Sequence, residues 1–294
     1  MLSTATAFQR YQEIRHKLPT APQNKTMLDI ENLKEISGKA GAFVFDALGV
    51  LNVGDCLIEG ADQRLSQLRQ QGCEIRILTN AASYDRTRAL EKFDRLGVTI
   101  DAAEIITSRD ATLSALTQNH WGIIADPDDA LTDIKFQHTR LGQNASEYEA
   151  VDGFLFLSSA NWSAQKQQLL EASLITNARP VLIANADLVA PRETGFSLEP
   201  GFYGHLLLDR GITDIRFFGK PFPEVYTLVE NSLPQLNPNE IIMCGDTLHT
   251  DILGATARGW RSVLVTQDGM FSGHETDIFC KESGIFADWR VKRI

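Results

Sequence analysis

FVFDALGVL, residues 43–51, has the pattern of a buried strand that ends at an aspartate and then turns at a glycine. On both sides of Asp46, short apolar segments alternate with longer amphipathic ones. Strand character is strongest at AFVF (42–45) and EIRIL (74–78), and helical periodicity at 61–72 and 84–97. This alternation predicts an α/β fold with a parallel sheet that helices cover on both faces.

The same alternation returns near the end of the chain. Strand-like segments lie at 214–218 (DIRFF), 240–244 (EIIMC) and 261–265 (RSVLV), with helical segments at 223–233 and 250–259. Between the two halves the pattern is less regular, with apolar segments WGIIA, GFLFL and VLIA and a helical segment near 162–173. We therefore predict a Rossmann-like parallel-sheet core formed by 41–108 and 191–294, an inserted α/β cap domain at 109–190, and an N-terminal helical extension at 1–40.

The composition limits the kind of partner. The 294-residue chain has a formal net charge of −10, which disfavours nucleic acid and anionic membranes. Its four cysteines lack the spacing of a zinc site or a disulfide framework. No apolar run is long enough for a membrane span, so we expect a cytoplasmic protein. The first 18 residues have helical spacing, which fits either an amphipathic helix packed on the core or an organellar transit peptide.

Polar side chains follow four of the predicted core strands. Because the carboxyl ends of parallel strands lie along one edge of a sheet, we expect these side chains to meet in one crevice. They are Asp46, Thr79 and Asn80, Lys220, and Asp246 with Asp251.

Together, these groups have the chemistry of a site for a cation and an oxyanion. Three clustered carboxylates repel one another unless a cation lies between them, and Mg²⁺ prefers oxygen ligands. With Lys220 and the hydroxyl of Thr79, such a cation would form a positive socket for a tetrahedral oxyanion, for which phosphate is the obvious candidate.

The motifs also resemble a known family. FDALGVL, LTN, GKP and GDTLHTDILGA are similar, in that order, to the four motifs of the haloacid dehalogenase superfamily. GD at 54–55, TNAAS at 79–83 and ANADLVAP at 184–191 resemble its class IIA branch, which contains sugar-phosphate, nucleotide and p-nitrophenyl phosphatases. The resemblance covers about 42–270.

The resemblance implies a role for each matching residue. Asp46 would attack phosphorus to form an aspartyl-phosphate, and Lys220 would neutralise charge and orient this nucleophile. Thr79 and Asn80 would join Lys220 in binding the phosphoryl group. Mg²⁺ would be held by the carboxylates of Asp46, Asp246 and Asp251 and by the backbone carbonyl of Leu48. The cap would select a small phosphorylated substrate, and a homodimer formed through the cap would be consistent with relatives of this class.

Leu48 departs from the family pattern. Phosphatases of this family usually have a second aspartate there, which protonates the leaving oxygen and later activates water. Leucine can do neither, and loss of a general acid–base group costs roughly 10²–10⁴ in rate. Our first hypothesis is a phosphatase that is slow, prefers good leaving groups or uses another acid–base group, for which Asp55, Asn52, His249 and a cap residue are candidates.

Two alternatives remain open at this point. A module that binds Mg²⁺ and a phosphorylated ligand without turnover would also tolerate Leu48. Dehalogenase-type hydrolysis is the other, because such enzymes lack the second aspartate as well. Two residues near the predicted return of the chain to the core, Asn185 and Asp187, match the family but could equally fix a turn.

Overall fold

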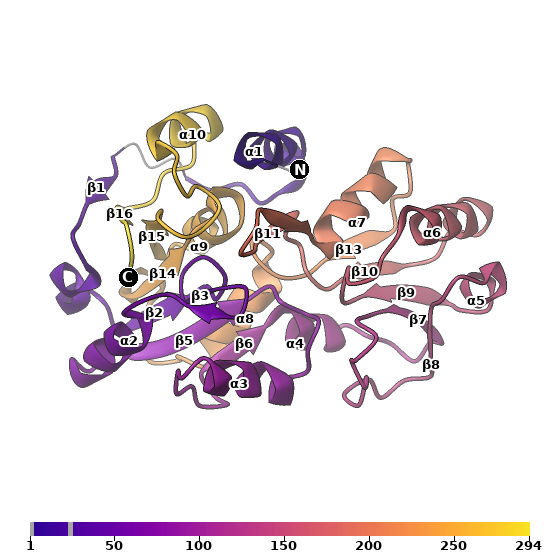
Figure 1. Ribbon diagram of the computed structural model, residues 1–294, viewed down its shortest axis with the longest axis horizontal. Coiled ribbons are helices and arrows are strands. Elements are labelled where there is room, and N and C mark those ends of the chain that lie inside the picture. The colour runs from indigo at the N-terminus through magenta and orange to yellow at the C-terminus, as the bar shows by residue number, and fades with distance from the viewer. Residues whose placement is uncertain (1–2, 23–25) are drawn as a thin grey trace.

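The computed structural model describes residues 3–22 and 26–294, and it contains two parallel sheets in two lobes (Figure 1). The larger sheet has seven strands in the order β1-β16-β15-β14-β2-β5-β6, and every neighbouring pair is parallel. Its strands are β1 (Leu28–Asp29), β2 (Ala42–Phe45), β5 (Glu74–Thr79), β6 (Ile105–Thr107), β14 (Ile241–Gly245), β15 (Arg261–Val265) and β16 (Trp289–Val291). The predicted Rossmann-like α/β core is thus confirmed.

Alternate residues of β2 enter two different apolar clusters, one on each face of the sheet. Ala42 and Val44 pack in the cluster that includes helices α8 and α4, whereas Phe43 and Phe45 pack in the cluster that includes helix α2. This double burial explains why the strand is continuously apolar. The helices of this lobe are α2 (Ala61–Gln70), α3 (Arg86–Arg95), α4 (Ser108–Leu113), α8 (Pro223–Asn231), α9 (Leu253–Ala257) and α10 (Thr276–Ser283).

The smaller sheet has five parallel strands in the order β13-β10-β9-β7-β8. They are β7 (Trp121–Ile124), β8 (His138–Arg140), β9 (Gly153–Phe156), β10 (Val181–Ile183) and β13 (Ile215–Phe217), accompanied by helices α5 (Ala145–Glu149), α6 (Ala164–Thr176) and α7 (Pro200–Asp209). Three of these strands lie where the sequence predicted strands of the inserted cap.

One strand was assigned to the wrong sheet. DIRFF was predicted to belong to the core, but β13 pairs with β10 in register Leu182 to Arg216, at the edge of the smaller sheet. The smaller sheet therefore extends past residue 190, where we predicted the inserted domain to end. The chain returns to the core only after β13, so the third motif lies at the junction between the lobes.

The N-terminal region is also partly different from the prediction. Helix α1 (Thr4–Glu13) is present, and its Phe8 and Tyr11 pack in an apolar cluster with Ile252 and Phe271 of the core. The later part of the extension predicted to be helical is different, because residues 28–39 form β1 and two short 3₁₀ helices, Leu33–Glu35 and Ser37–Lys39, in place of an α-helix. The predicted extension at 1–40 includes residues outside the described ranges.

Two small antiparallel hairpins complete the fold. They are formed by β3 (Asn52–Val53) with β4 (Cys56–Leu57), and by β11 (Val189–Pro191) with β12 (Phe196–Leu198). Over residues 3–22 and 26–294, no helix has the length and apolar character that crossing a bilayer requires.

Candidate active site

Three neighbouring strands of the larger sheet deliver the predicted site residues to one edge. β14, β2 and β5 lie side by side, and Asp246, Asp46 and Thr79 occur where these strands end. The cavity at this edge has a volume of about 190 Å³ and is lined by Asp46, Leu48, Thr79, Asn80 and Asp246, among others.

A buried lysine lies between two of the carboxylates. Nζ of Lys220 is 2.5 Å from Oδ1 of Asp46 and 2.7 Å from Oδ1 of Asp251. Carboxylate oxygens of Asp46, Asp246 and Asp251 all lie within 4.8 Å of one another. The structure therefore brings together four residues that are up to 205 positions apart in the sequence, counting from Asp46 to Asp251.

Burial and mutual repulsion dominate the electrostatics of this cluster. Burial raises the pKa of Asp46 to about 6, with the Lys220 ammonium opposing the shift and Asp251 adding to it. Burial and the two neighbouring carboxylates raise the pKa of Asp246 to about 8. For Lys220, burial lowers the pKa, but the carboxylates around it outweigh burial and raise it above the usual value. The cluster thus has a surplus of buried negative charge.

The residue set fits a divalent metal ion. It offers oxygen ligands from three converging carboxylates, which is the donor chemistry that Mg²⁺ prefers. The backbone at Gly49 also comes close to this cluster, since a Cβ at Gly49 would lie only 2.5 Å from Oδ2 of Asp246. Leu48 lines the same cavity, and the metal contact predicted for its carbonyl stays a prediction.

The two carboxylates of the fourth motif, Asp246 and Asp251, are held by backbone amides. The amide of Met270 donates to Oδ2 of Asp246 at 2.7 Å, and the amide of Thr247 donates to Oδ2 of Asp251 at 3.0 Å. Asp251 lies in a π-helical turn, Leu248–Ile252, which directly precedes α9. These bonds fix the direction of each carboxylate before any ligand binds.

Asn80 has a role that the sequence did not reveal. Its Oδ1 accepts from the amide of Lys220 at 2.6 Å, and its Nδ2 donates to the carbonyl of Lys220 at 2.9 Å and to Oδ1 of Asp187 at 2.8 Å. The carboxamide therefore clamps the backbone of Lys220, and its predicted phosphate contact is not shown by this geometry.

Asp187, which the sequence left as a turn former or a site residue, lines the cavity. Burial raises its pKa well above the usual value, opposed by Lys220 and increased by Asp46. The family-like stretch ANADLVAP was the signal that could have placed it in the site.

Two of the candidate replacements for the missing acid at Leu48 are engaged elsewhere. Nδ2 of Asn52 donates to the carbonyl of Gly54 at 2.6 Å. The ring of His249 stacks on Tyr11 with centroids 5.0 Å apart, its Nε2 lies 2.7 Å from Oε1 of Gln12, and burial lowers its pKa to about 3. Asp55 does line the cavity, although its side chain is 94% exposed.

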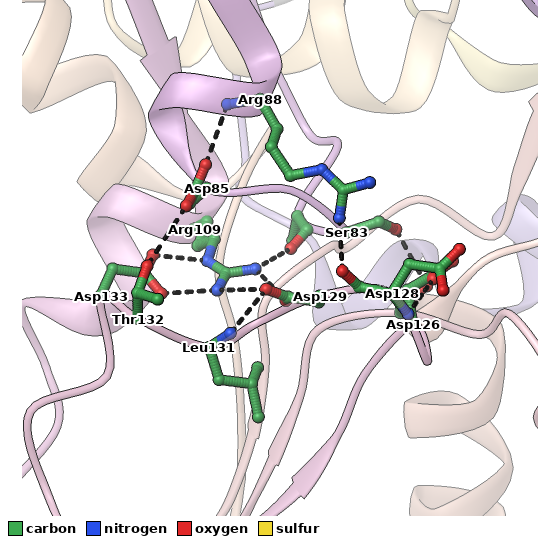
Figure 2. A network of polar contacts seen from close by, with 12 residues as sticks. Ser83, Asp85, Arg88, Arg109, Asp126, Asp128, Asp129, Leu131, Thr132 and Asp133 are labelled. Atoms are coloured by element: carbon green, nitrogen blue, oxygen red, sulfur yellow. Dashed lines mark hydrogen bonds and ion pairs between the residues drawn. The ribbon is translucent and has the colours of Figure 1, made fainter.

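A second polar network joins the two lobes beside the site. Figure 2 shows Arg109 of α4 between Asp129 and Asp133, which belong to the loop after β7. Its Nη1 donates to Oδ2 of Asp129 and its Nη2 to Oδ1 of Asp133, both at 2.6 Å. Nη1 also donates to the carbonyl of Ala82 at 3.1 Å, so the network reaches the loop that follows Thr79.

Comparisons with known proteins agree with this geometry. Residues 43–127 match the family model of haloacid dehalogenase-like hydrolases, and residues 217–280 match a HAD-hydrolase-like model. The chain therefore belongs to the haloacid dehalogenase-like hydrolases, and by class it is a phosphoric monoester hydrolase.

Individual relatives cover most of the chain. Haloacid dehalogenase-like hydrolase domain-containing protein 2 of Bos taurus is 27% identical over 76% of this chain and 83% of its own length. The phospholysine phosphohistidine inorganic pyrophosphate phosphatase of Danio rerio is 26% identical over 80% and 85%. A solved structure of a possible sugar phosphatase of the HAD superfamily from Cytophaga hutchinsonii has a TM-score of 0.80, 24% identity, and coverage of 90% and 98%.

Proposed function

We propose that this protein is a slow Mg²⁺-dependent phosphatase that cleaves a small phosphorylated metabolite, of the sugar-phosphate or nucleotide type, through an aspartyl-phosphate on Asp46. The observation that carries the proposal is the approach of Asp46 to Lys220, Asp246 and Asp251, next to a cavity that Asp46 and Asp246 line. Haloacid dehalogenase phosphatases generally use Mg²⁺, which supports the assignment of the metal.

In the first step, a carboxylate oxygen of Asp46 attacks the phosphorus atom. A bond forms between this oxygen and phosphorus, and the bond between phosphorus and the leaving oxygen breaks. Lys220 holds Asp46 in place and balances charge, and the hydroxyl of Thr79 is available to the phosphoryl oxygens. Bound Mg²⁺, held by Asp46, Asp246 and Asp251, would supply further positive charge against the phosphoryl group.

In the second step, water attacks the aspartyl-phosphate and releases inorganic phosphate and free Asp46. Both steps use proton transfer in phosphatases that have an aspartate two residues after the nucleophile. Because Leu48 has no titratable group, the leaving group departs without a proton from this position, and water is not activated from it. We therefore expect the second step to limit the rate for substrates with good leaving groups.

The direct test is rapid-mixing hydrolysis of p-nitrophenyl phosphate with Mg²⁺. The wild type should release a burst of p-nitrophenol that approaches one equivalent per site, followed by slow turnover. Asp46→Asn should abolish both phases. Acid quenching of the wild type during turnover should leave phosphate attached to the protein.

The same Leu48 favours a second candidate, a module that binds Mg²⁺ and a phosphorylated ligand without turnover. A wild type that gives neither a burst nor turnover above Asp46→Asn, yet binds inorganic phosphate in a Mg²⁺-dependent way, would support this candidate. Chloride release from 2-chloropropionate would instead support dehalogenase-type hydrolysis.

A further inference from the structure

An apolar recess opens beside Leu48. It has a volume of about 40 Å³, and Ala89, Phe93 and Ile105 contribute to its lining. It shares Leu48, Thr79, Ala81, Tyr84 and Lys92 with the larger cavity, so the two spaces adjoin at this wall. Leu48 is thus part of a continuous apolar surface that begins next to Asp46.

Lys92 is the cationic residue common to both spaces. It lies in α3, and its side chain is only 21% exposed. Its ion-pair partner among the described residues is Asp55, at 3.9 Å, whose own side chain is almost fully in solvent. A long contact to an exposed carboxylate is weakly stabilising, so this ammonium is largely desolvated without a strong partner.

The charges around Lys92 favour an additional anion. Burial lowers its pKa, Arg192 and Arg95 lower it further, and Asp55 and Glu193 oppose them. An anion placed next to this ammonium would gain an attraction that the protein itself supplies only partly. The lysine lines the same two spaces as Leu48, so a leaving group bound beside Leu48 would share its cavity with this ammonium.

We propose that Lys92 stabilises the departing oxygen of the substrate as an anion. The preferred substrate is then not a sugar phosphate or nucleotide with an alkoxide leaving group, as the family resemblance suggests, but a phosphate whose leaving group is acidic: an aryl, enol or acyl phosphate with a small apolar part that faces Leu48 and Phe93. The inference builds on the proposed phosphatase function. Lys92 takes the role of a charge stabiliser where the chain lacks a proton donor.

The step balances without a proton. The bond from Asp46 to phosphorus forms, the bond from phosphorus to the leaving oxygen breaks, and the electron pair of that bond stays on the leaving oxygen. An aryl or acyl oxygen holds this pair as a stable anion next to the ammonium of Lys92. The alkoxide of a simple alkyl phosphate is far more basic, so such substrates react slowly.

The test measures how the burst rate depends on the leaving group. It compares p-nitrophenyl, phenyl and acetyl phosphate, which have acidic leaving groups, with glycerol phosphate, whose leaving group is an alkoxide. Lys92→Gln should lower the burst rate by about 10²-fold for the aryl and acyl phosphates, near the lower end of the effect of losing one donor to a developing oxyanion. The burst rate should then also fall more steeply with the pKa of the leaving group. Lys92→Arg, which keeps the charge, should retain the wild-type dependence.

Lys281→Gln is the matched control, because it is the same substitution at a lysine of α10 that is exposed and lines neither space. It should leave the rates within about twofold of the wild type, as expected for an exposed charge. If the wild type is active and Lys92→Gln behaves like Lys281→Gln, the role of Lys92 is overturned while the proposed phosphatase function stands. A wild type no faster than Asp46→Asn on every ester overturns the proposed function and this inference together.

Discussion

At position 48 an apolar side chain lies on the wall of a cavity whose other residues are largely charged or polar. Leucine in place of the family's second aspartate removes proton transfer from this position. It leaves the carboxylates, Lys220 and the hydrogen bonds that orient them in place. Binding and nucleophilic attack therefore depend on groups that the chain has, whereas protonation depends on one that it lacks. This separation lets the two contributions be measured independently.

Restoring an acid–base group at this position should accelerate turnover. We expect Leu48→Asp to raise kcat for glycerol phosphate, whose alkoxide is a poor leaving group, by about 10²-fold, near the lower end of the usual effect of general acid–base catalysis. Leu48→Asn is the control, because asparagine has nearly the shape of aspartate but no titratable proton. Equal kcat values for the two variants in steady-state assays would show that the missing acid does not limit this site.

At the scale of elements, the clamp between Asn80 and Lys220 matters because Lys220 follows β13, an edge strand of the smaller sheet, rather than a core strand. The lysine is carried by the segment that returns from one lobe to the other. Asn80, directly after β5, ties that segment to the core sheet. The backbone that carries the ammonium towards Asp46 is thus tied to the core sheet by the side chain of Asn80.

Loss of this clamp should affect chemistry more than substrate binding. Asn80→Ala leaves the buried amide of Lys220 without its 2.6 Å acceptor, at a cost of about 1–3 kcal/mol in unfolding free energy. We expect kcat to fall at least 10-fold, because the lysine loses its fixed position. Asn177→Ala, at an exposed position, is the control. Urea unfolding and steady-state kinetics of both variants measure the two effects, and an unchanged kcat for Asn80→Ala would contradict the positioning role.

The elements also show what the sequence could and could not predict. β2 and β14 were predicted from apolar runs that a doubly covered sheet requires, and the carboxylates that follow them did converge. β13 was misassigned because its apolar pattern resembles a core strand, and strand pairing is decided by distant residues. The role of Lys92 was missed because helical periodicity places it in α3 without showing which cavity it lines.

At the scale of the whole molecule, the Arg109 network fixes how the two lobes meet. Its arginine is 1% exposed and Asp129 is 2% exposed, so the pair is desolvated and each partner depends on the other. Arg109→Met would leave Asp129 as a buried carboxylate without its cation, and we expect the free energy of unfolding to fall by about 3–5 kcal/mol.

Arg88→Met tests whether this effect is specific, because Arg88 contacts the same loop through the carbonyl of Asp128 from a more exposed position. It should cost less than about 1 kcal/mol. Chemical unfolding followed by tryptophan fluorescence compares the variants. Equal losses for Arg88→Met and Arg109→Met would contradict a special role for the buried pair.

Metal binding should also be visible in the stability of the whole molecule. The folded protein concentrates three carboxylates within 4.8 Å, an arrangement that the unfolded chain does not have. Mg²⁺ should therefore bind the folded state preferentially and stabilise it by about 2.7 kcal/mol at a concentration 100 times its Kd. The reason is electrostatic, since the cation relieves the repulsion that raises the pKa of Asp246 to about 8. Thermal melting in EDTA and in increasing Mg²⁺ measures the effect as a rise in Tm.

Asp246→Asn should remove most of this rise, whereas Asp94→Asn, at an exposed position of α3, should keep it. A Tm that does not respond to Mg²⁺ in the wild type would show that the carboxylates do not form a metal site, and the mechanism would then depend on Lys220 as the cation next to Asp46.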